Sequence, residues 1–178
     1  MDYELLDSGQ GRRLERFGDY VLSRPDPQVV WERSLPEKQW QKATAVFDRD
    51  WKITNMSREW EMKWEDLKLQ LRLTPFKHVG VFPEQEWEWT WLSQAISKSQ
   101  IPSLNILNLF GYTGVASLVC AKAGAKVTHV DGSRPAISWA RKNQELSGLD
   151  HLPIRWICDD VLKFVGREVK RGVKYDGV

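Results

Sequence analysis

The chain has 178 residues, 42% hydrophobic and 28% charged, with a formal net charge of +2. This composition fits a soluble globular protein of one medium-sized or two small domains, and the charge is too small to indicate a nucleic-acid partner by itself. No apolar stretch predicts a transmembrane helix, and no secretory signal precedes the first turn signals. We therefore expect no membrane partner. Cys120 and Cys158 form no Cys-x-x-Cys pair, so we expect two buried structural thiols and a cytoplasmic protein. We also expect no metal.

Residues 1–75 consist of short alternating runs that turn signals separate. The clearest run has Leu67, Leu69, Leu71 and Leu73 on one side and polar residues on the other, which is the period of a half-buried strand. The pattern predicts a small antiparallel β subdomain, with strands in the runs 3–11, 14–22, 45–47, 51–54 and 67–73.

From residue 76 the pattern changes to strands that alternate with helices. We expect helices at 84–99, 115–123, 134–147 and 161–170, and strands at 104–110, 126–131 and 154–158, with a fourth strand opening at 175–178. Such alternation predicts an α/β fold with a doubly wound, mainly parallel, Rossmann-like sheet. Three strands and part of a fourth are few for this class, so we expect residues 76–178 to be an incomplete domain and the chain to be a fragment.

Aromatic and basic residues give a weaker signal. The chain has ten tryptophans; Trp87, Trp89 and Trp91 alternate, whereas Trp60 and Trp64 are at helical spacing. Core or interface packing is the simpler reading, and base stacking is the alternative. The basic cluster of Arg12, Arg13 and Arg16 could likewise contact RNA phosphates or form a solvated face.

A glycine turn follows the strand 104–110. Gly111 and Gly114 lie just past the carboxyl end of that strand, where glycine allows a tight turn and close approach to a ligand. A dinucleotide fingerprint requires three glycines, but Leu109 replaces the first. The turn therefore favours a cofactor without a pyrophosphate, such as S-adenosylmethionine, over a nicotinamide dinucleotide.

Acidic residues end the next two strands. Asp131 follows the glycine turn by about 20 residues, the offset of an acid that accepts from both ribose hydroxyls; a turn-forming or helix-capping acid is the alternative. Asp159 and Asp160 end the third strand, where an acid can accept from the adenine amine or cap the following helix. The two roles can coexist. His129 lies inside a strand, and we expect it in the core.

These motifs together resemble the class I S-adenosylmethionine-dependent methyltransferases. The segments 107–114, 130–133, 140–143 and 158–161 match most narrowly the branch of bacterial ribosomal RNA cytosine-C5 methyltransferases and their uncharacterised relatives. The run 79–85 resembles the loop that lies over the cofactor in that branch, although Glu84 stands where the family more often has aspartate. The N-terminal segment 3–31 also looks like the small β domain of one uncharacterised group in the branch.

The resemblance implies a role for each motif. The turn 108–114 would lie along the methionine part of S-adenosylmethionine, Asp131 would bind the ribose with Ser133 nearby, and Asp160 would face the adenine. Phe82 and Gln85 would close the pocket from above. The expected cofactor-binding residues are Phe82, Gln85, Asn108, Phe110, Gly111, Thr113, Gly114, Asp131, Ser133, Asp159 and Asp160.

The family's Asp-Pro-Pro-aromatic catalytic motif would follow the strand that opens at 175–178, so no catalytic residue is expected within this chain and the chain alone should be inactive. The resemblance implies an RNA substrate, most simply ribosomal RNA, and a part in rRNA processing. The alternatives are a non-catalytic RNA-binding module and an NAD-dependent oxidoreductase.

Overall fold

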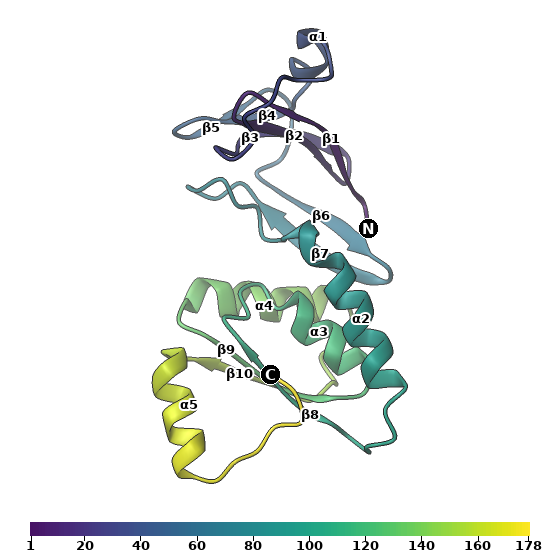
Figure 1. Cartoon of the computed structure of the whole chain (residues 1–178), viewed down its shortest axis with the longest axis vertical. Coiled ribbons are helices and arrows are strands. Elements are labelled where there is room, and N and C mark those ends of the chain that lie inside the picture. The colour runs from purple at the N-terminus through teal and green to yellow at the C-terminus, as the bar shows by residue number, and fades with distance from the viewer. The chain divides into compact units, whose positions relative to one another are not determined.

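A computed structural model describes all 178 residues of the chain (Figure 1). The chain divides into two compact units, Met1–Gly80 and Val81–Val178, here called the N-terminal and the C-terminal unit. No helix in either unit combines the length and the apolar character needed to cross a membrane.

The N-terminal unit contains two sheets and one short helix. Neighbouring strands of the larger sheet are antiparallel except for the pair β3–β4, which is parallel. The larger sheet has the order β1 (Tyr3–Gly9), β2 (Arg12–Phe17), β3 (Tyr20–Pro25), β4 (Ala45–Phe47) and β5 (Trp51–Ile53); α1 (Glu37–Trp40) precedes β4, and β6 (Glu59–Trp64) pairs with β7 (Leu67–Arg72).

The pair β6–β7 shows why this unit is built from strands. On β6, Trp60, Met62 and Trp64 are all buried, and each lies opposite a buried leucine of β7. Trp60 and Trp64 therefore share one face of a strand, which corrects the helical reading of their spacing. The residues between them are charged and exposed, so the period is two, as for a strand with one buried face.

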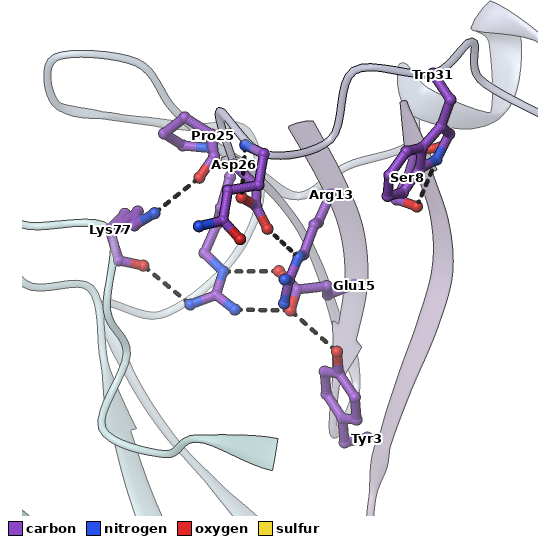
Figure 2. Close-up of polar contacts among 10 residues, drawn as sticks. Tyr3, Ser8, Arg13, Glu15, Pro25, Asp26, Trp31 and Lys77 are labelled. Carbon is purple, nitrogen blue, oxygen red and sulfur yellow. Dashed lines mark hydrogen bonds and ion pairs between the residues drawn. The ribbon is translucent and has the colours of Figure 1, made fainter. Parts of the chain in front are cut away.

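A buried ion pair links two strands of the larger sheet of the N-terminal unit. Glu15 on β2 is 1% exposed, and Arg24 on β3 donates to both of its carboxylate oxygens at 2.7 and 2.8 Å. The Tyr3 hydroxyl donates to the same carboxylate at 3.0 Å, and Arg24 also donates to the carbonyl of Lys77 at 3.1 Å (Figure 2). Each charge is thus paired and hydrogen-bonded, as burial requires.

The C-terminal unit has a parallel sheet in the order β10–β9–β8. Beyond β8, Gly177 forms a single parallel bridge with Ile106, where the opening of a fourth strand was expected. The strands are β8 (Asn105–Leu109), β9 (Lys126–Asp131) and β10 (Ile154–Cys158), and the helices are η1 (Pro83–Gln85), α2 (Glu86–Ser97), α3 (Val115–Lys122), α4 (Arg134–Leu146) and α5 (Val161–Lys170).

Helices cover both faces of this sheet. On one face, Val127 packs with Ile96 of α2 and Cys120 of α3. On the other face, Val130 packs with Phe164 of α5. In Figure 1, α3 and α4 lie on the face opposite to α5. Helices on both faces of a parallel sheet confirm the predicted doubly wound α/β fold.

Candidate functional site

A cavity of about 310 Å³ opens at the carboxyl end of β8, within the C-terminal unit. This volume lies at the lower end of the range of small-molecule sites. In an open parallel sheet, ligands bind at this edge because the loops that follow the strands converge there. The predicted site residues that line the cavity are Phe82, Gln85, Asn108, Phe110, Gly111 and Thr113.

The turn from β8 to α3 has an unusual backbone. Phe110 and Tyr112 have φ values of 54° and 50°, and Gly114, the N-cap of α3, has φ 84°. Left-handed conformations cost about 1–3 kcal/mol for residues other than glycine and persist only where the surroundings enforce them. We therefore expect specific contacts to hold this turn.

Asp131 supplies one such contact. Its Oδ2 accepts a hydrogen bond from the backbone N–H of Tyr112 at 2.9 Å, and its Oδ1 accepts from the N–H of Ser133 at 2.8 Å. One half-buried carboxylate thus ties the glycine turn to the loop that follows β9. The sequence indicated Asp131 as a site residue, but it did not reveal this bond to Tyr112.

Side chains beneath the turn explain both of its glycines. A Cβ on Gly111 would lie 2.3 Å from Cε1 of His129, and a Cβ on Gly114 would lie 2.8 Å from Cβ of Ala140 and 3.1 Å from Trp156. Real Cβ contacts are essentially never as short as the first two distances, and the third is tighter than most. The glycines are therefore required by His129 and Ala140 below the turn, in addition to the tight turn and the approach of a ligand that the sequence indicated.

His129 is fully buried, as expected, and belongs to a polar chain under the turn. Its Nδ1 lies 2.9 Å from the hydroxyl oxygen of Ser117, to which the Asn108 amide donates at 2.9 Å. Burial lowers the pKa of His129 to about 4, against an opposing effect of Asp131. The imidazole is therefore neutral at neutral pH.

Aromatic rings cover the turn from another side. The ring centroids of Phe82 and Tyr112 are 5.4 Å apart, and those of Tyr112 and Trp139 are 6.2 Å apart. Such separations are typical of favourable aromatic pairs. Phe82 thus lies against the glycine turn, while Gln85 is exposed at the end of η1.

The remaining acidic and hydroxyl residues form helix ends and do not line the cavity. Ser133 caps α4, with its Oγ accepting from Ala136 N at 3.3 Å, and Asp160 caps α5, with its Oδ1 accepting from Lys163 N at 2.9 Å. Asp159 forms an ion pair with Arg167, and this hydrogen bond is the main reason that the pKa of Asp159 is lowered.

The two cysteines differ from each other. Cys120 is buried on α3, and burial raises its pKa to about 11. Cys158 is exposed, so the expectation of a buried thiol was wrong there. The reason is its position as the last residue of β10, an edge strand of this sheet.

The three tryptophans of α2 also differ in exposure. Trp89 is buried at 1% exposure, but Trp87 and Trp91 are 69% and 63% exposed. Residues two apart in a helix point to different faces, so the alternation buries only the middle ring. Trp89 therefore packs in the core as expected, whereas Trp87 and Trp91 do not, and interface packing stays a prediction for these two.

The N-terminal arginines are engaged by their own unit. Arg13 pairs with Asp26 at 2.5 Å, and Arg16 pairs with Glu4. Arg12 donates to the carbonyl of Phe47 at 2.7 Å. These partners favour a structural role over phosphate contacts. No group of three or more His, Cys, Asp or Glu side chains is arranged to hold a metal ion.

Comparisons with known proteins extend this description. No family model matches the chain. The crystal structure of an S-adenosylmethionine-dependent methyltransferase from Agrobacterium tumefaciens is 48% identical, with a TM-score of 0.95 over 99% of this chain and 58% of that chain.

Two curated relatives are named as ribosomal RNA methyltransferases. Ribosomal RNA large subunit methyltransferase K/L of Syntrophotalea carbinolica is 29% identical over 164 residues, which are 92% of this chain and 22% of that protein. Ribosomal RNA large subunit methyltransferase I of Aeromonas salmonicida is 40% identical over 84 residues, which are 47% of this chain and 21% of that protein. The chain thus spans about a fifth of the length of these curated relatives. The doubly wound sheet, the glycine turn and these similarities agree: the chain belongs to the class I S-adenosylmethionine-dependent methyltransferases.

Proposed function

We propose that the C-terminal unit binds S-adenosylmethionine along the turn between β8 and α3. The observation that carries this proposal is the turn itself: its backbone is held in left-handed conformations at the mouth of a cavity, and side-chain Cβ atoms are excluded at Gly111 and Gly114. The turn follows the carboxyl end of β8, which is where ligands bind in an open parallel sheet. When bound, the cofactor supplies a methyl group on a sulfonium centre.

Each part of the cofactor is assigned to the residues that follow one strand of the sheet. The turn lines the methionine part of the cofactor, and Asp131 accepts from the ribose hydroxyls. Its two oxygens each hold one backbone N–H, and a carboxylate has lone pairs to spare for further donors. Asp159 and Asp160 lie on the adenine side at the end of β10. Ser133 stands beside the ribose, and Phe82 with Gln85 shields the cavity from water.

Calorimetric titration of the chain with S-adenosylhomocysteine and with NADH tests this function. We expect S-adenosylhomocysteine to bind and NADH not to bind, because Leu109 stands where a pyrophosphate site needs its first glycine. Binding of NADH alone would favour an oxidoreductase and would remove our proposal.

For the whole protein, we propose a methyltransferase that acts in the cytoplasm on a base in RNA, with ribosomal RNA as the first substrate to test. The names of the curated relatives support this choice. Attack on cytosine C5 needs a thiolate, and Cys120 is a protonated, buried thiol whose pKa is raised to about 11. Cys158 is exposed, but it ends β10 on the proposed adenine side, so we assign no nucleophile within this chain.

The substrate is tested by transfer of labelled methyl from S-adenosylmethionine to unmodified ribosomal RNA by the whole protein. Labelled nucleosides in the digested RNA would support the proposal, and the labelled atom would identify the branch. RNA binding without any binding of S-adenosylhomocysteine would instead favour a non-catalytic RNA-binding module.

A further inference from the structure

We propose that His129 is a positioning residue for the glycine turn: its imidazole supports Gly111 from below and, through Ser117, fixes the Asn108 amide at the wall of the cavity. This inference rests on the proposed cofactor site. Nothing in the sequence pattern assigned His129 more than a place in the core.

The position of His129 follows from the register of the sheet. Asn108 on β8, His129 on β9 and Trp156 on β10 are direct neighbours in the parallel ladder. They therefore form one row of side chains across the sheet, on the face that carries α3. The rings of His129 and Trp156 are 4.6 Å apart.

This row, here called the platform, lies directly beneath the turn. Gly111 rests on the imidazole of His129, and Gly114 rests on the indole of Trp156. The indole is itself held, because its Nε1 donates to Gln144 of α4 at 3.0 Å. A Cβ at Gly111 is excluded by the imidazole, and a Cβ at Gly114 is excluded by Ala140 and crowded by the indole, so these side chains set the height of the turn above the sheet.

Hydrogen bonds beneath the turn also fix the orientation of the Asn108 amide. Ser117 is fully buried on α3, and its hydroxyl oxygen accepts from the Asn108 amide and lies against Nδ1 of His129. A hydroxyl has one proton to donate, and the neutral imidazole offers one acceptor nitrogen. In the proposed arrangement the hydrogen bonds run in one direction, from Asn108 through Ser117 to Nδ1, with the imidazole proton on Nε2.

The consequence for the cavity concerns Asn108, which lines it. With the amide nitrogen held by Ser117, the amide oxygen is the atom that remains to accept from a bound ligand. The opposite orientation of the amide would present a donor there. His129 thus acts on the cofactor through two neighbours and touches no reacting atom.

One atom of the imidazole has no partner. Nε2 of His129 is buried and makes no hydrogen bond. An unpaired buried polar atom costs about 1–3 kcal/mol, so an apolar side chain would pack here at lower cost if packing were the only role. The presence of an imidazole at this cost indicates that the contact of Nδ1 with Ser117 has a role in the site.

Two substitutions separate positioning from packing. The amide oxygen of His129→Asn occupies the place of Nδ1, whereas the amide of His129→Gln occupies that of Nε2 and fills more of the volume. If Nδ1 positions the turn, His129→Asn keeps the dissociation constant for S-adenosylhomocysteine within about threefold, and His129→Gln raises it about tenfold. If His129 only fills space, the larger His129→Gln variant binds better, and this reversed order would overturn the inference.

A second variant and a ligand-free measurement complete the test. Ser117→Ala removes the link at nearly constant volume and should also raise the dissociation constant about tenfold, while His151→Gln, at an exposed loop, should leave it unchanged. In the ligand-free chain, nitrogen NMR should find the His129 proton on Nε2; a proton on Nδ1 would contradict the proposed direction. If wild-type chain fails to bind S-adenosylhomocysteine, the proposed function fails, and the NMR result still decides the hydrogen-bond chain.

Discussion

At the scale of single residues, the site depends on one carboxylate with two structural bonds. Asp131 holds the N–H of Tyr112 in the glycine turn and the N–H of Ser133 in the next loop. The sequence offered a ribose ligand and a turn-forming acid as alternatives. The two hydrogen bonds show that Asp131 is a turn-forming acid. This role is compatible with ribose binding, because an acid that anchors the glycine turn also lies beside the turn.

Replacement of Asp131 should therefore weaken cofactor binding strongly. Asp131→Ala loses both charged hydrogen bonds and the ribose acceptor, and we expect the dissociation constant for S-adenosylhomocysteine to rise by at least about 100-fold. Asp131→Asn retains one acceptor and should fall between this variant and wild type. Calorimetry measures both, and an unchanged affinity in Asp131→Ala would remove Asp131 from the site.

Substitution of Gly111 tests, by a steric clash alone, whether the platform supports the turn. Gly111→Ala places a Cβ 2.3 Å from Cε1 of His129, and we expect its free energy of unfolding in urea to fall by about 1–3 kcal/mol. His129→Ala removes the ring, so the same glycine substitution should cost much less in that background.

The control for this cycle is Gly166→Ala on α5, where an added Cβ meets nothing within 4 Å. There alanine should stabilise the helix by about 0.5–1 kcal/mol. Strictly additive effects of Gly111→Ala and His129→Ala would show that the ring does not support the turn.

At the scale of elements, local patterns predicted the C-terminal unit well. The strands β8, β9 and β10 and the helices α3, α4 and α5 fall where periodicity and caps placed them, because each carries its own signal: an apolar run, a Ser133 or Asp160 cap, or a glycine stop. In the N-terminal unit β6 was missed, although Trp60, Met62 and Trp64 alternate with charged residues as a strand requires.

What could not be predicted depends on register. The row of Asn108, His129 and Trp156 exists only because three strands pair at these positions, and the residues are 21 and 27 positions apart along the chain. The exposure of Cys158 likewise depends on which strand lies at the sheet edge. Neither feature leaves a trace in local periodicity.

Two substitutions of Asp160, at the N-terminus of α5, distinguish a helix-capping role from a contact with the ligand. Asp160→Ala removes the bond to Lys163 N and should lower the free energy of unfolding by about 1 kcal/mol, whereas Asp160→Ser keeps a capping oxygen and should restore it. If Asp160 also faces the adenine, Asp160→Ser should still bind S-adenosylhomocysteine about fivefold more weakly, since its shorter side chain withdraws the acceptor. Wild-type affinity in both variants would restrict Asp160 to capping.

At the scale of the whole molecule, one buried group in each unit responds to a different end of the pH range. In the N-terminal unit, burial and the neighbouring Glu15 raise the pKa of Tyr3, so its contribution to stability is present below pH 10 and is lost as the pH rises through the raised pKa. In the C-terminal unit, burial lowers the pKa of His129 to about 4, so protonation in acid favours the unfolded chain.

The acid response should be measurable above the range in which the carboxylates titrate. Between pH 6.5 and 4 the unfolded chain binds a proton at His129 that the folded chain does not, so stability falls with pH, by about 2 kcal/mol between pH 7.5 and pH 5. The pKa values of Asp7, Asp159 and Glu168 are lowered, so their contribution to stability is lost only as the pH falls through the ordinary carboxylate range of about 4 and below. Urea unfolding at the two pH values measures the difference, and His129→Asn, which cannot be protonated, should abolish most of it. An equal loss in wild type and variant would show that His129 is not the group responsible.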